Sequence, residues 1–348
     1  MKKIRHNIFK IAERFSAAYF AFTMATGIVS IAAYLMGMNQ IAWLLFQLNK
    51  AAFILLLLLL LSRLIYFPLR LVREITAPDR GPAAFTVVAG TCLLGSQFII
   101  LSRDYTMGSL HWIAGSILWF FLIYAFFFRV IVQQDKPAIV DVLDGGWLIY
   151  VVGTQSISVL GSLVAVQFIF SYESLFIVPL VMYLLGSMLY IVIIVLLFYR
   201  LVFLPISDKN ITPVYWINMG AGAITTLSGA TLLKHSDLSP LLHEIVPFLK
   251  GMTLFYWAFT TWWIPLLLLV TAWRFSYERF RITYNVQYWS MVFPLGMYAV
   301  CTFHLGNILG IPILSNIASI FFYFSIVTWG ITFLGMSKQI VSIFSQRG

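Results

Sequence analysis

Charged residues are scarce in this chain, and acidic ones are the scarcest. The 348 residues include 12 Asp and Glu against 22 Lys and Arg, and 61% of the chain is hydrophobic. Such a composition excludes an ordinary soluble globular protein. Cysteine is rare too: Cys92 and Cys301 both fall in hydrophobic segments, so we expect neither a disulfide framework nor a metal site.

Polar stretches long enough to fold outside a membrane are also missing. We therefore predict a single all-α integral membrane domain over residues 1–348, because a helix needs about 20 apolar residues to cross a bilayer. The first hydrophobic run is too long for a signal peptide and is expected to be a retained helix. Ten segments qualify as spans: about 16–37, 41–65, 83–101, 109–131, 147–166, 175–204, 214–233, 247–273, 288–308 and 313–333.

The basic residues predict the orientation. Only Arg103, Lys234 and Lys250 fall in segments on one side, whereas Lys50 lies within the second span and the other Lys and Arg residues lie in segments on the opposite side. The positive-inside rule then places both termini in the cytoplasm. Since the cations are scattered over six segments, we expect no nucleic-acid partner.

The spans alternate between two compositions. Even-numbered spans are bulky, as in FILLLLLLLSRLIYF and ILWFFLIYAFFFRV, whereas odd-numbered spans are rich in small residues, as in FTVVAGTCLLGS and INMGAGAITTLSGAT. Small residues allow close helix approach or leave open space, and large ones suit lipid. We predict that the odd spans are interior and the even spans peripheral.

A fivefold repeat accompanies this alternation. One glycine recurs in each odd span at intervals of 63 to 74 residues, and Trp147, Trp216 and Trp289 open the last three odd spans. The pattern predicts five helical hairpins in a pseudo-fivefold arrangement around a central pore. A close-packed bundle without a conduit is the alternative. The recurring glycines are Gly27, Gly90, Gly153, Gly222 and Gly296.

The acidic residues indicate what such a pore would carry. All twelve lie in loops, termini or span edges, so the interior offers no carboxylate for cations or proton relay. Hydroxyl, amide and backbone N–H groups can still hold an anion. Besides the five glycines, the lining candidates are Thr23, Thr26, Gln155, Ser156, Asn218, Thr225, Thr226 and Thr302.

Each candidate also has a structural interpretation. Ser and Thr in spans often bond their own helix carbonyl one turn back. Gln155 and Asn218 must find partners for their amides, which favours an interior position. Lys50 is expected to extend toward the outer surface and His304 to lie at the interface, with proton sensing as an alternative for His304.

A proline interrupts the ninth span. Pro294 removes a backbone donor and Gly296 gives the helix freedom to bend, so the neighbouring Phe293 is positioned to move relative to the axis. A phenyl ring in a narrow uncharged constriction would block hydrated anions. We predict Phe293 as the gate, with ordinary packing as the alternative.

The segments FAFTMATGIVS, GGWLIYVVGTQSISVL, YWINMGAGAI and YWSMVFPLGMY resemble the tellurite-resistance/dicarboxylate transporter family. Its relatives include plant slow-type anion channels, bacterial tellurite-resistance proteins, fungal malate permeases and fungal sulfite pumps. The resemblance implies five helical hairpins around a pore, commonly as a homotrimer, with the gate phenylalanine at Phe293. This chain lacks the long tails of the plant channels, so the resemblance implies a multi-pass protein of a prokaryotic plasma (inner) membrane. Only Pro294 lies inside an odd span.

Two functions compete. The first is a channel that conducts small anions passively, and the second is a secondary carrier for C4-dicarboxylates such as malate or for sulfite, with or without proton coupling. No nucleophile–His–acid set or phosphate-binding glycine loop indicates an enzyme, and no cofactor is expected.

Overall fold

The chain folds into a bundle of helices. The computed structural model describes residues 12–13, 15–168, 173–205, 212–278 and 284–345, and this part of the chain contains no strand. Several basic residues counted for the orientation lie outside it: Lys2, Lys3, Arg5, Lys10, Arg14, Lys209, Arg279, Arg281 and Arg347.

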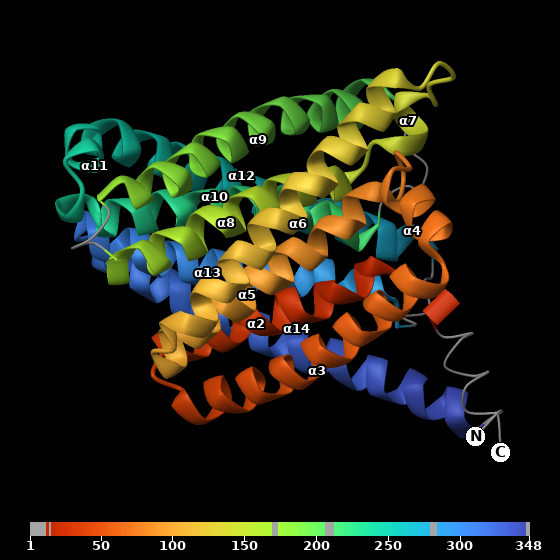
Figure 1. The fold of residues 1–348 in the computed structure, drawn as a ribbon, viewed down its shortest axis with the longest axis horizontal. Helices are drawn as coiled ribbons and strands as arrows, with labels where there is room; N and C mark the ends of the chain where they lie inside the picture. The colour runs from red at the N-terminus through yellow and green to blue at the C-terminus, as the bar shows by residue number, and fades with distance from the viewer. Residues whose placement is uncertain (1–11, 14, 169–172, 206–211, 279–283, 346–348) are drawn as a thin grey trace.

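Five helical hairpins follow one another along the chain. The first helices of the hairpins are α2 (Ala21–Leu35), α5 (Phe85–Ser102), α8 (Ile149–Ala165), α10 (Ile217–Lys234) and α13 (Trp289–Leu309). Their partners are α3 (Asn39–Tyr66), α6 (Tyr105–Val132), α9 (Ile177–Phe203), α12 (Val246–Glu278) and α14 (Pro312–Ser345). The short helices α4 (Pro68–Ile75) and α7 (Ile139–Val142) lie at one end of the bundle and α11 (Pro240–Glu244) at the other (Figure 1).

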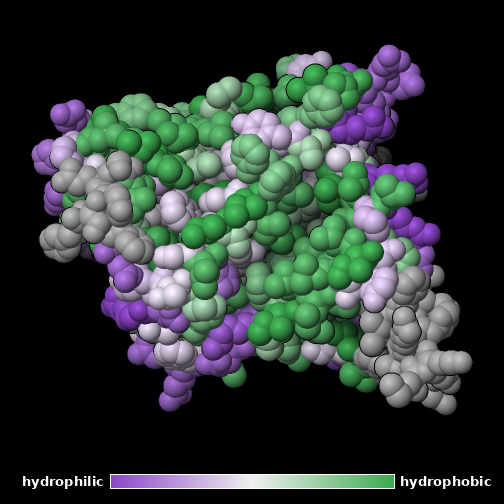
Figure 2. Space-filling model, in the orientation of Figure 1, coloured by the Kyte–Doolittle hydropathy of each residue, from purple (hydrophilic) through white to green (hydrophobic). Residues whose placement is uncertain are grey.

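Membrane-spanning character is clear for most of these helices. Within the described residues, nine helical segments are long and apolar enough to cross a membrane. The seventh predicted span, 214–233, corresponds to α10 and is not among them, because its small and hydroxylated residues lower its hydropathy. Hydrophobic side chains cover the middle of the visible face and hydrophilic ones gather toward its two ends (Figure 2).

The predicted division into interior and peripheral helices is confirmed. In the four first helices that qualify as spans, 72 to 94% of the most hydrophobic window is buried, against 22 to 44% in the second helices. In α10 every residue from Ile217 to Leu233 is buried. We call α2, α5, α8, α10 and α13 the inner helices and their partners the outer helices.

The inner helices contact one another in a closed series. α2 packs on α5, α5 on α8, α8 on α10, α10 on α13, and α13 returns to α2. Some outer helices pack against two neighbouring inner helices at once: α6 contacts both α5 and α8, and α14 contacts both α13 and α2. A small-residue face lets each inner helix pack between two others, whereas bulky residues face outward.

Each inner helix begins with one turn of 3-10 helix. These turns are η1 (Ala17–Phe20), η2 (Gly81–Ala84), η3 (Gly145–Leu148), η7 (Pro213–Trp216) and η9 (Val286–Tyr288). The side chains of Ser16, Asp144 and Asn285 accept a backbone N–H at three of them, and Pro82 and Pro213 open the other two. Both devices favour a helix start, since the first N–H groups lack helical partners. The five repeats thus share a local fold as well as a composition.

Indole–hydroxyl hydrogen bonds connect successive hairpins. Trp119 on α6 donates to Thr154 on α8 over 2.8 Å, and Trp257 on α12 donates to Thr302 on α13 over 3.0 Å. Trp329 on the last helix donates to Thr26 on the first inner helix over 3.0 Å. This last bond closes the ring between the two ends of the chain.

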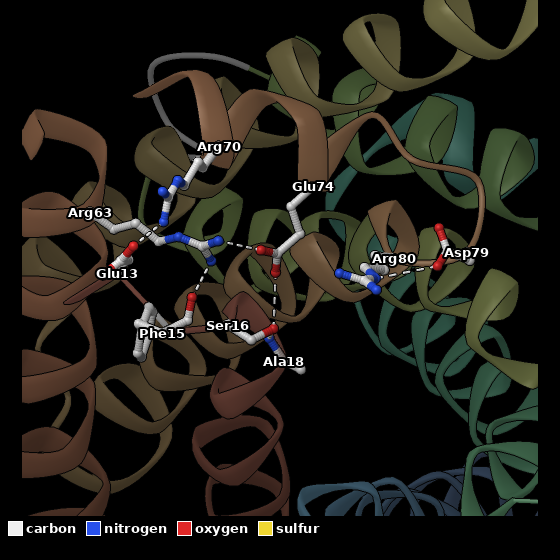
Figure 3. Close-up of polar contacts among 9 residues, drawn as sticks. All are labelled: Glu13, Phe15, Ser16, Ala18, Arg63, Arg70, Glu74, Asp79 and Arg80. Carbon is white, nitrogen blue, oxygen red and sulfur yellow. Dashed lines mark hydrogen bonds and ion pairs between the residues drawn. The ribbon is translucent and has the colours of Figure 1, made fainter. Parts of the chain in front are cut away.

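A polar network fixes the end of the bundle at which α2 begins (Figure 3). Arg63, at the end of α3, donates to Phe15 O and pairs with Glu74 of α4, and Glu74 also accepts from Ser16 Oγ at 3.1 Å. Arg70 of α4 pairs with Glu13. Since Ser16 caps the 3-10 turn η1, the network ties the first inner helix to the end of its outer partner.

Candidate functional site

A cavity of about 320 Å³ opens where the inner helices end. Residues from all five inner helices line it, so it lies on the common axis of the ring. The lining residue nearest the start of each inner helix is aliphatic. These five residues, which we call the aliphatic floor, are Ile28, Leu93, Val159, Leu227 and Val300.

The rim of the cavity is basic. Arg103 caps the end of α5, Lys234 ends α10, and His235 and His304 line the same space, whereas no Asp or Glu is among its described lining residues. Burial and the adjacent Lys234 lower the pKa of His235 to about 4, so this imidazole is neutral at pH 7. At that pH, Arg103 and Lys234 supply the fixed positive charge.

The turn between α5 and α6 orients its two charged residues differently. Arg103 adopts the left-handed conformation with φ of 57° and donates its N–H to Ile99 O. Asp104 next to it caps α6, where its carboxylate accepts from Met107 N at 2.9 Å. The carboxylate therefore serves the start of α6, and the Arg103 side chain forms no ion pair within the described part of the chain.

Phe293 lies deeper than the cavity. It precedes Val300 of the floor by seven residues, a distance of roughly 10 Å along α13. Its side chain is fully buried and packs against Gly220 of α10, which likewise precedes the floor residue Leu227 by seven residues. Pro294 lies inside the continuous helix α13 and also faces Gly220, and Gly296 faces Ile28 and Val29 of α2.

The recurring glycines lie at contacts between helices. A Cβ at Gly90 would reach Thr23 of α2 at 2.5 Å, and one at Gly222 would reach Thr260 of α12 at 2.2 Å. Gly153 faces Phe85, and Gly27 faces Asn49 of α3 at 3.1 Å. Among the five, none lines the cavity. Close approach of neighbouring helices accounts for all of them.

The hydroxyl candidates are engaged within the bundle. Four donate to a carbonyl three or four residues earlier in their own helix: Thr23, Ser156, Thr225 and Thr226. Thr26 and Thr302 accept the indole N–H groups of outer helices. None of the six lines the cavity, so we omit them from the lining proposed below.

The two amides differ. Gln155 donates to Tyr183 O of α9 at 3.1 Å and lies against Gly186, so its amide faces an outer helix. Asn218 is fully buried, and its amide nitrogen and oxygen have no hydrogen-bond partner among the described residues. Asn218 thus leaves both polar atoms of its amide without a partner among the described residues, whereas Gln155 leaves only its Oε1.

The lining residues were largely missed at the level of sequence. Arg103 and Lys234 served there only to assign the orientation, and His304, expected at the interface, also lines the cavity. Lys50 lies over the Phe46 ring at 4.6 Å, outside the cavity lining. The sequence did contain a signal for Arg103 and Lys234. They are two of the three cations expected on the outer side, and both lie where an inner helix ends.

A closed ring of membrane-spanning helices with a basic-rimmed cavity on its axis is an architecture typical of membrane transport proteins. Sequence comparison supports this class. The model of the family described as voltage-dependent anion channel (SLAC1) matches residues 14–337. The chain belongs to this family, and the resemblance inferred from its motifs is confirmed.

Named relatives agree with this assignment. An uncharacterized transporter of Methanocaldococcus jannaschii is 24% identical over 343 residues, which cover 95% of this chain and 96% of the relative. A second transporter of that archaeon is 24% identical over 344 residues, 95% of this chain and 94% of the relative. An uncharacterized membrane protein of Mycobacterium tuberculosis is 33% identical over 160 residues, 46% of this chain and 81% of that protein.

Proposed function

We propose that this protein is an anion channel that conducts small anions passively along the axis of the five inner helices. One observation carries the proposal: all five inner helices meet at a cavity whose described lining includes Arg103 and Lys234 and no carboxylate. Uncompensated positive charge in a low-dielectric mouth raises the local anion concentration and repels cations. Below the rim the axis is uncharged, so anions are not held too tightly to leave.

Phe293 is the proposed gate. Together with the aliphatic floor it forms an apolar stretch of roughly 10 Å below the cavity, in which a hydrated anion finds no replacement for its water. The ring packs against Gly220, where no side chain opposes it. Asn218, two residues before Gly220, is the proposed polar group nearest to this constriction.

Chloride currents of the reconstituted protein test the gate. Phe293→Ala should raise chloride conductance at least several-fold over the native protein, because the largest apolar group of the constriction is removed. Phe322→Ala is the matched control, since Phe322 is equally buried but lies on the outer helix α14. Equal conductance in the native protein and Phe293→Ala would remove Phe293 from the gate, and a larger current for potassium than for chloride would contradict an anion channel.

A carrier is the second candidate, because the archaeal relatives are named transporters. It predicts saturable malate or sulfite flux without chloride current in either the native protein or Phe293→Ala. Asn218→Leu separates the roles of the buried amide: changed anion selectivity supports a place on the path, and unchanged selectivity and conductance return Asn218 to packing.

The proposed orientation places the cavity outside the cell. The cavity lies at the ends of α5 and α10, where Arg103 and Lys234 are, and the opposite end of the bundle holds Arg63, Arg70 and most of the other basic residues that the structure describes. By the positive-inside rule that opposite end faces the cytoplasm, together with both termini.

A further inference from the structure

We propose that the outer cavity is a binding site for a divalent oxyanion, held between Arg103 on one wall and Lys234 on another. Only the functional consequence of this binding rests on the proposed function: a tightly held divalent anion at the mouth of the channel would slow chloride entry from outside. The binding itself depends only on the cavity.

The two cations reach the cavity from separate walls. Arg103 ends α5 and Lys234 ends α10, and α8 lies between these helices in the ring of contacts. A ligand between the two walls is therefore approached from two directions. Two point charges so placed favour an anion with negative charge on more than one side over a monovalent ion.

No described carboxylate forms an ion pair with either cation. The side chains of Arg103 and Lys234 form no ion pair or hydrogen bond with any described residue. Asp104 caps α6, and Asp237 lies in a neighbouring pocket, 3.7 Å from His243. The described lining of the cavity thus holds the two cationic side chains and no carboxylate, and a divalent anion balances that charge.

Hydrogen-bond donors are available beside the cations. Tyr34 and Tyr105 line the cavity, and their hydroxyl groups have no hydrogen-bond partner in the described part of the chain. Ser96 and Thr231 already donate to carbonyls of their own helices. Arginine, lysine and phenol donors suit the oxygens of an oxyanion, and the 320 Å³ volume leaves room for part of its hydration shell.

Sulfate serves as the probe. The thermal stability of the purified protein is measured over a sulfate titration, with chloride at equal ionic strength as the reference, since a ligand that binds only the folded state raises the melting temperature. We expect a saturable sulfate-specific rise for the native protein. Arg103→Gln and Lys234→Gln should each increase the sulfate concentration at half-saturation at least tenfold.

The matched control is Lys250→Gln. Lys250 is also an outer cation, but it lines the neighbouring pocket and not this cavity, so its replacement should leave the sulfate titration unchanged. Arg103→Lys, which keeps the charge, should retain most of the affinity and covers the case in which Arg103→Gln does not fold. The absence of a saturable rise in the native protein overturns the proposal, as does an equal titration in all variants.

Failure of this site is distinguishable from failure of the proposed function, because the titration requires no transport. If sulfate binds as expected and the native protein conducts chloride, external sulfate should reduce the chloride current and internal sulfate should not. If sulfate binds but Phe293→Ala conducts no chloride, the site stands and the channel proposal falls.

Discussion

Phe293 of α13 lies directly against Gly220 of α10. A Cβ on Gly220 would come within 3.3 Å of two ring carbons of Phe293 and within 2.8 Å of Pro294 Cγ. Two inner helices therefore approach at the level proposed for the gate, and the absence of a side chain at position 220 is what allows it. The glycine is as much part of this constriction as the phenylalanine.

Gly220→Ala should separate the two helices or displace the ring. A proline ring cannot rotate away as a flexible side chain would. We therefore expect the free energy of unfolding to fall by about 1–3 kcal/mol, which is typical of overpacking. The melting temperature should fall by several degrees, and chloride leak through the reconstituted protein should increase.

Gly251→Ala on α12 controls for the loss of a helical glycine. A Cβ there has no neighbour within 4 Å, so the free energy of unfolding should rise by about 0.5–1 kcal/mol through helix propensity, and the chloride leak should stay unchanged. A Gly220→Ala protein as stable and as tight as this control would show that the contact carries no constraint.

Arg63→Ala should weaken the network at the opposite end of the bundle. Arg63 and Glu74 have side-chain exposures of 7% and 18%, and Arg63 also holds Phe15 O. Its removal leaves a largely buried carboxylate unpaired, which costs about 3 kcal/mol, the lower end of the range for breaking a buried ion pair. Thermal melting of the purified protein measures the loss.

Arg80→Ala is the comparison for that prediction. Arg80 and Asp79 are 74% and 52% exposed at a separation of 3.3 Å, so water screens the pair and its loss should cost at most about 0.5 kcal/mol. Similar melting temperatures for the two variants would mean that burial does not distinguish the pairs.

Composition was sufficient to predict the architecture. Segments such as FTVVAGTCLLGS, whose small residues suit close helix packing, alternate with segments such as ILWFFLIYAFFFRV, whose bulky residues suit lipid. The different burial of the inner and outer helices confirms the division that this alternation predicts. The 3-10 turns that open the inner helices were missed, although Ser16, Asp144 and Asn285 are typical capping residues.

The site was less predictable, for a physical reason. The repeat pattern and the composition of a span predict that a residue is interior, but they do not predict whether its side chain faces the axis or a neighbouring helix. Gln155 and Thr26 are interior and polar as expected, yet Gln155 donates to a carbonyl of α9 and Thr26 accepts from Trp329. The trimer and the gating role of Phe293 stay predictions.

The bond between Trp329 and Thr26 should couple the last hairpin to the first. A double-mutant cycle of Trp329→Phe and Thr26→Val should give a coupling free energy of about 0.6–1.7 kcal/mol, the range for hydrogen bonds between membrane helices. Thermal unfolding of the four proteins supplies the cycle. Trp329→Phe with Thr302→Val is the control cycle, because Thr302 bonds Trp257 instead, and its coupling should stay within about 0.5 kcal/mol.

His235 should make the stability of the protein depend on pH in a defined range. Its pKa is about 4 in the folded protein, lowered first by burial and then by Lys234, against 6.5 ordinarily. Between these values the unfolded chain binds a proton that the folded protein does not, so the stability contributed by the neutral imidazole is lost as the pH falls from 6.5 toward 4. Melting curves between pH 7 and pH 4 should therefore decline less steeply for His235→Gln than for the native protein. Lys234→Gln, which removes a neighbouring charge that lowers this pKa, should give an intermediate slope, and identical slopes for all three proteins would show that His235 is already free to take up a proton in the folded state.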